Sequence, residues 1–207
     1  EKAGALRYLL TGFKTVSSVP SVFILMLTFG VLATVYLPTE MVILPRYFNE
    51  TNNPAGLGII LSAMAFTAGF MSLMFEWVAK RLSFSNIMRV ALIGVALTVV
   101  VMSFLPPYWL LLAVGLLLGA FWGPLGPLLN TVVQRKVPAN MRGRVFSLEM
   151  TIWTGGPMIS MVIVGASLDW FGVQPVYFVV AGLTLLSALL VAFNKRAPEL
   201  NTAEYQD

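Results

Sequence analysis

The stretch VQRKVPANMRGRVFSLE, residues 133–149, places four basic side chains around a proline and a glycine, between two strongly apolar segments. Only 11% of the 207 residues are charged, whereas soluble proteins average about a quarter. Apolar runs of about 20 residues cross the hydrocarbon core of a bilayer as helices. The stretch is therefore typical of a short surface loop between two membrane-spanning helices, with Gly143 allowing a tight backbone between the arginines.

The hydropathy on both sides of this loop predicts an all-α membrane protein with six transmembrane helices. We expect the spans at residues 20–44, 57–78, 87–105, 108–132, 145–168 and 175–193. The predicted domains are a cytoplasmic amphipathic segment over 1–19, a six-helix bundle over 20–193 and a cytoplasmic tail over 194–207. The bundle uses nearly all of the chain.

The basic residues give the bundle an orientation. Short loops rich in Lys and Arg stay on the cytoplasmic side of a membrane. With both termini cytoplasmic, only Arg46 of the 13 basic residues falls outside. The positive charges behind the net charge of +4 thus lie mainly on one side of the membrane. Because membrane orientation accounts for them, we predict no nucleic-acid partner. Arg142 and Arg144 are expected to reach anionic phospholipid head groups of a plasma membrane, the inner membrane of a bacterium.

The residue types that the chain lacks argue against several classes of function. The chain contains no cysteine and no histidine, which removes the commonest metal ligand and the usual general base. We therefore predict no metal, no cofactor and no enzymatic activity.

Glycines and prolines mark two further features of the fourth and fifth spans. Gly115, Gly119 and Gly123 recur every four residues, so they share one helix face where a second helix can approach closely. A face that lines a cavity is the alternative. Pro124 and Pro157 lack a backbone N–H and permit kinks.

A faint internal repeat accompanies them. NNPAGLGII, residues 52–60, and VPANMRGRV, residues 137–145, both place Pro-Ala and a glycine ahead of an apolar run. One stretch lies outside and the other inside, as an inverted three-plus-three repeat requires.

Three longer segments resemble one family of transporters. LLNTVVQRKVPANMRGRVFSL, residues 128–148, is similar to the linker between the tenth and eleventh helices of major facilitator superfamily exporters of the macrolide-efflux branch. Residues 155–186 resemble the last two helices of that branch, and LPTEMVILPRYF, residues 37–48, resembles its seventh-to-eighth helix region. The similarity covers about residues 5–195. The acidic-basic loop signature of the superfamily is not legible over residues 75–89.

This resemblance implies the C-terminal half of a twelve-helix, proton-coupled drug exporter that works by alternating access. Its expected partners are an N-terminal six-helix half, protons and a hydrophobic or amphipathic substrate. Residues 1–19 would then be the end of the central cytoplasmic loop. A self-contained six-helix channel or a homodimeric pore is the alternative.

Glu40 is the candidate for proton coupling. A charged side chain within the membrane is energetically costly, so an acid found there is a functional candidate. It lies four residues before the predicted end of the first span, about 6 Å deep. The resemblance implies that this helix lines the central cavity. The competing interpretation is an interfacial glutamate that pairs with Arg46 or is solvated.

Aromatic residues are the candidates for the substrate cavity. Trp122 and Trp153 are expected at similar depths of roughly 12–15 Å from the inner surface, and Tyr36 lies one turn before Glu40. Amphipathic drugs bind in apolar, aromatic-lined cavities with few polar groups. Core packing is the alternative for each ring.

A second group of polar residues lies at the predicted cytoplasmic surface. Asn130 and Glu149 are expected at comparable depths at the inner ends of the fourth and fifth spans, beside Arg142 and Arg144. We interpret these four residues as a cytoplasmic gate, with the arginines pairing with Glu149 when the inside is closed. A substrate site is the alternative for Glu149 and Asn130.

Overall fold

The computed structural model describes residues 19–194 and 200–201. The predicted segment 1–19 therefore lies almost entirely outside the described residues, and of the tail only Asn194, Leu200 and Asn201 are within them. Within the described residues, six helical spans are long and apolar enough to cross a membrane, which confirms the predicted fold class.

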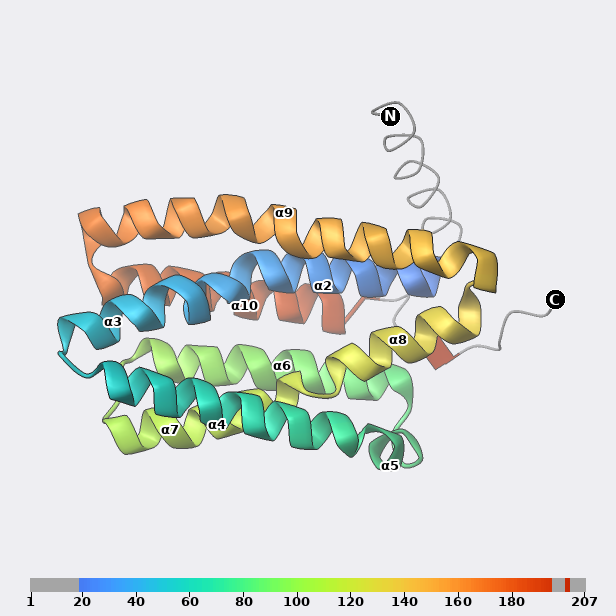
Figure 1. Ribbon diagram of the computed structural model, residues 1–207, viewed down its shortest axis with the longest axis horizontal. Coiled ribbons are helices and arrows are strands. Elements are labelled where there is room, and N and C mark those ends of the chain that lie inside the picture. Colours follow the sequence, from blue (N-terminus) through green and yellow to red (C-terminus); the bar gives the residue numbers. More distant parts are fainter. Residues whose placement is uncertain (1–18, 195–199, 202–207) are drawn as a thin grey trace.

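The elements follow one another with short connections. In chain order they are α2 (Pro20–Pro38), the π-helix η1 (Thr39–Ile43), α3 (Leu44–Glu50), α4 (Pro54–Leu73), α5 (Phe75–Ala79), α6 (Phe84–Ser103), α7 (Tyr108–Trp122), α8 (Leu125–Lys136), α9 (Ala139–Phe171) and α10 (Val173–Ala192). In Figure 1 the helices run roughly side by side along the long axis of the molecule.

The first and fourth spans are both 29 residues long and both interrupted. In the fourth span, α7 ends at Trp122 and α8 begins at Leu125, so the break predicted from Pro124 is confirmed. In the first span, η1 separates α2 from α3, directly after Pro38. This second interruption was not predicted, although two prolines, Pro38 and Pro45, flank it.

The predicted span boundaries differ from the observed ones by several residues, and two differ by six. The first span continues to Glu50 rather than ending at residue 44, because Arg46 bonds Glu50 one turn later at 2.6 Å and supports the final turns. The fifth span begins at Ala139 rather than 145, immediately after Pro138. Gly143 therefore lies inside α9 and makes no tight turn.

The bundle consists of two triplets of spans, the first to third and the fourth to sixth, and each triplet packs a helix against the other. The second helix of each triplet packs on the first helix of the other triplet, α4 on α7 and α9 on α2, and the third helices α6 and α10 pack on one another. This is the pattern that an inverted three-plus-three repeat requires. The two Pro-Ala motifs occupy equivalent places, since α4 begins at Pro54 and α9 at Ala139.

The glycine face of α7 packs against α4, as predicted. A Cβ added to Gly119 would lie 2.1 Å from the backbone oxygen of Met64, and one at Gly123 would lie 2.3 Å from that of Ala68. Only a missing side chain lets the two backbones come this close.

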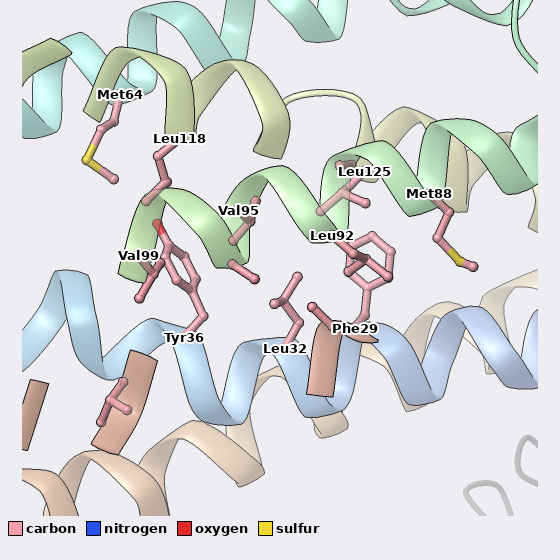
Figure 2. Packing of buried hydrophobic residues seen from close by; sticks show 14 of the residues in the cluster. Phe29, Leu32, Tyr36, Met64, Met88, Leu92, Val95, Val99, Leu118 and Leu125 are labelled. Atoms are coloured by element: carbon pink, nitrogen blue, oxygen red, sulfur yellow. The ribbon is translucent and has the colours of Figure 1, made fainter. Parts of the chain in front are cut away.

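The core lies between α2 and α6. Figure 2 shows Phe29, Leu32 and Tyr36 of α2 pointing toward Leu92, Val95 and Val99 of α6. Tyr36 is fully buried in this layer, which fixes the position of its hydroxyl for the site described next.

Candidate functional site

Glu40 lies in the π-helix and is held by the residue one turn before it. The Tyr36 hydroxyl donates a hydrogen bond to Glu40 Oε1. Single turns of π-helix occur frequently at functional sites, because they change the direction of side chains within a helix. Here η1 belongs to a span whose residues are mostly buried.

The competing interpretation, in which Glu40 pairs with Arg46, is not what the structure contains. Arg46 bonds Glu50 at 2.6 Å and lies 3.5 Å from Asp169 of α9. Glu40 lies ten residues before the end of α3 at Glu50, roughly 15 Å along the helix, and not the four residues predicted. The observed partner of Glu40 is Tyr36.

A cavity of about 350 Å³ opens beside Glu40. It lies between η1, α4 and α7, and Glu40 contributes to its wall. The remaining lining residues are Met41, Leu61, Met64, Ala65, Ala68, Leu118, Gly119 and Trp122. Glu40 is thus the single ionisable group in an apolar wall.

The three predicted aromatic residues come together beside this cavity, but only Trp122 of the three lines its wall. The rings of Tyr36 and Trp122 have centroids 4.8 Å apart, and those of Trp122 and Trp153 are 5.9 Å apart. Phe29 extends the series at 6.2 Å from Trp153. Residues of α2, α7 and α9 therefore form one continuous aromatic series that ends at the carboxyl group of Glu40.

Two buried hydroxyl groups near Glu40 were not predicted. Thr39 Oγ1 and the hydroxyl of Tyr177 on α10 have no hydrogen-bond partner in the described part of the chain. Both side chains belong to residues with 0% exposure. No spacing in the sequence joins the sixth span to the first. The only available signal was a tyrosine in an otherwise apolar span.

The predicted gate residues lie where α8 and α9 meet. Arg142 Nε donates to the carbonyl of Val137 at 2.9 Å, and its Nη2 donates to that of Gln134 at 2.5 Å. Arg142 therefore closes the C-terminal end of α8. Arg144 Nη1 contacts Met141 Sδ at 3.6 Å.

The other two predicted gate residues, Glu149 and Asn130, lie apart from these arginine contacts. Glu149 is half-buried on α9, about 10 Å along the axis from Arg142. Asn130 is exposed on α8. The pairing of the arginines with Glu149 stays a prediction.

Other acids have surface partners. Outside the spans, Glu76 bonds Lys80 at 2.8 Å, and this hydrogen bond lowers the pKa of Glu76 from its ordinary value of 4.5. Within residues 19–194 and 200–201, no three acidic residues come together as a metal site would need.

Comparison with known proteins gives a consistent set of relatives. The family model described as Major Facilitator Superfamily matches residues 19–206. The chain is 29% identical over 169 residues to a protein of Mycolicibacterium fortuitum named "Multidrug efflux pump Tap", which covers 81% of this chain and 41% of that protein.

A second relative is a Lactococcus lactis protein named "Multi-drug resistance efflux pump PmrA homolog". It is 27% identical over 136 residues, which is 66% of this chain and 33% of that protein. The chain thus spans about two fifths or less of the length of these curated relatives.

Proposed function

The chain belongs to the Major Facilitator Superfamily, and from this premise we propose that it is one half of a proton-coupled exporter of hydrophobic or amphipathic small molecules. The chain is a multi-pass membrane protein of transporter type, and its relatives are named as drug efflux pumps. The single observation that carries the proposal is the position of Glu40, bonded to a buried tyrosine on one side and open to a cavity on the other.

The cavity suits the proposed substrate class. Its wall is apolar apart from Glu40, and Trp122 joins it to the aromatic series that includes Trp153. Drug-sized ligands bind in such cavities through apolar and aromatic contacts, with a few polar groups fixing their orientation. Trp122 is the proposed substrate contact in the cavity wall, and Tyr36 and Trp153 support its ring from behind that wall.

Glu40 is the proposed proton carrier. A charged carboxylate is unfavourable in a membrane interior, so Glu40 prefers a proton unless it gains a cationic partner or water. Substrate entering the cavity, or water reaching it from the other side of the membrane, changes that balance. Protonation of Glu40 and binding of substrate in the cavity are thereby linked. Exchange of a proton for a substrate molecule requires such a link.

The proposed partner is an N-terminal six-helix half. The most apolar stretches of α4 and α9 are the least enclosed of the six spans, with only 17% of their residues buried, against 67% in the first span. Their exposed side chains include Phe66 and Phe70 on α4 and Ile159 and Val162 on α9. Alternating access would arise from rocking of the two halves about the cavity.

The cytoplasmic gate completes the proposal. We place both chain termini in the cytoplasm of a bacterium, so that the junction of α8 and α9 faces inward. Arg142, Arg144, Asn130 and Glu149 would form and break contacts there as the inner side closes and opens, with anionic head groups as further partners of the arginines.

The test uses the complete gene product in proteoliposomes. A pH gradient should drive transport of a fluorescent lipophilic drug in the unaltered protein, and Glu40→Gln should abolish that dependence. Glu50→Gln removes an equally sized surface acid and should leave coupling intact. Coupled transport that survives Glu40→Gln would refute the role of Glu40. Passive flux from residues 1–207 alone would favour the channel instead.

A further inference from the structure

The hydroxyl group of Tyr177 is buried at the same point of the fold as Glu40. Tyr177 lies in the second turn of α10, has 0% exposure and has no hydrogen-bond partner in the described residues. Its hydroxyl lies within electrostatic reach of the Glu40 carboxyl, and α10 packs against η1. A buried hydroxyl without a partner is unfavourable, so a native protein seldom retains one without use.

The hydrogen-bonding capacity of a carboxyl group suggests what that use is. A protonated carboxyl has one donor and reduced acceptor capacity, whereas an ionised carboxylate accepts at about four positions. One tyrosine, Tyr36, already bonds Glu40. Loss of the proton from Glu40 therefore creates a demand for a second donor. Thr39 and Tyr177 have the two buried hydroxyls without a partner in the described residues, and that of Tyr177 comes from a second helix, α10, which packs against η1.

The charged groups nearest to Glu40 on neighbouring helices pair with one another. On α3, Arg46 pairs with Glu50, and on α9 Asp169 pairs with the same arginine. The cavity wall contributed by α4 and α7 contains no ionisable side chain. From α2 and α10 the groups are the two tyrosines, Tyr36 and Tyr177.

We propose that Tyr177 is a positioning residue for the coupling step, and that its hydroxyl donates a hydrogen bond to the Glu40 carboxylate when Glu40 has released its proton. This inference rests on the proposed role of Glu40. The two tyrosines would then hold the charged carboxylate between α2 and α10. In the protonated state Tyr36 alone holds Glu40.

The experiment is a double-mutant cycle on the purified complete gene product, with thermal unfolding measured across the pH range. Tyr177→Phe keeps the buried ring and removes only the hydroxyl. We expect it to lower Tm at alkaline pH, where Glu40 is charged, and to leave Tm unchanged or raised at acid pH. In the Glu40→Gln background this pH dependence should vanish. Tyr108→Phe, which removes a hydroxyl that bonds the Gly56 carbonyl, is the matched control and should show no such dependence.

A transport measurement supplies the second readout. Without the Tyr177 hydroxyl, the acidic limb of the efflux-against-pH profile should move to higher pH by about one unit, the equivalent of one hydrogen bond to a charged group. Tyr108→Phe should leave the profile in place.

The results separate this inference from the proposed function. A Tyr177→Phe protein with Tm raised equally at every pH, in both backgrounds, would overturn the inference. It would show that the Tyr177 hydroxyl does not bond Glu40 in either protonation state. Coupled transport that survives Glu40→Gln would instead refute the coupling role, while the unfolding cycle would still report whether Tyr177 and Glu40 interact.

Discussion

Gly119→Ala is the substitution that best tests the packing on which the cavity depends. The added Cβ would lie 2.1 Å from the backbone oxygen of Met64 and 2.3 Å from Thr67 Oγ1. Real Cβ contacts do not fall below 3.0 Å, so α4 and α7 must separate by roughly 1 Å at this point. A backbone oxygen cannot rotate away as a side chain can.

The expected cost follows from that displacement. Overpacking of a well-packed interface costs about 1–3 kcal/mol, offset in part by the gain of about 0.5–1 kcal/mol when alanine replaces glycine in a helix. Gly126→Ala on α8 is the matched control, because nothing lies within 4 Å of its added Cβ. It should be neutral or slightly stabilising.

The assay is thermal unfolding of the purified complete gene product, together with binding of a fluorescent drug. Gly119→Ala should lower Tm and weaken drug binding, since Gly119 also lines the cavity. If Gly119→Ala and Gly126→Ala had equal Tm and equal drug affinity, the close approach of α4 and α7 would be refuted.

Further predictions concern the rings, the helix ends and one surface acid. Trp122→Ala should weaken drug binding and efflux, whereas Trp109→Ala, at an exposed position, should not; equal effects in a binding assay would contradict the aromatic series. Arg142→Gln should lower Tm by removing two hydrogen bonds to carbonyls at the end of α8, a loss of about 1 kcal/mol because water can reach these partly exposed carbonyls. Asn201→Ala should remove both bonds to Ser85 and speed proteolysis of the tail, and an unchanged rate of cleavage would count against that contact. Glu76 has a lowered pKa, so its pair with Lys80 is intact at neutral pH and is lost as the pH falls through that pKa, below 4.5; because the pair is exposed, Glu76→Gln should leave Tm at pH 7 unchanged.

Features with a local period were predictable from the sequence. The glycines at 115, 119 and 123 share a helix face by spacing alone, and their contact with α4 is what the structure shows. Tyr36 and Glu40 are four residues apart, so their meeting needed only a helix at that position. The sequence predicts similar depths for Trp122 and Trp153 in spans that run in opposite directions, and the structure adds that their rings pack 5.9 Å apart.

Features that depend on tertiary contacts or on hydrogen-bond register were not predictable. The π-helix at Thr39–Ile43 is a shift in backbone bonding, which hydropathy does not record. The approach of Tyr177 to Glu40 joins spans that are far apart in the chain, and no periodicity connects them. The early start of α9 was missed because the charges of Arg142 and Arg144 indicated a loop, whereas Arg142 is used to close α8.

The most direct test of the central claim is proton release on substrate binding. The complete gene product, in weakly buffered detergent solution with a pH indicator dye, is mixed with a saturating lipophilic cationic drug. We expect the unaltered protein to release protons on binding, and Glu40→Gln to bind the drug and release none. Equal proton release from both proteins would contradict the claim that Glu40 couples the cavity to the proton.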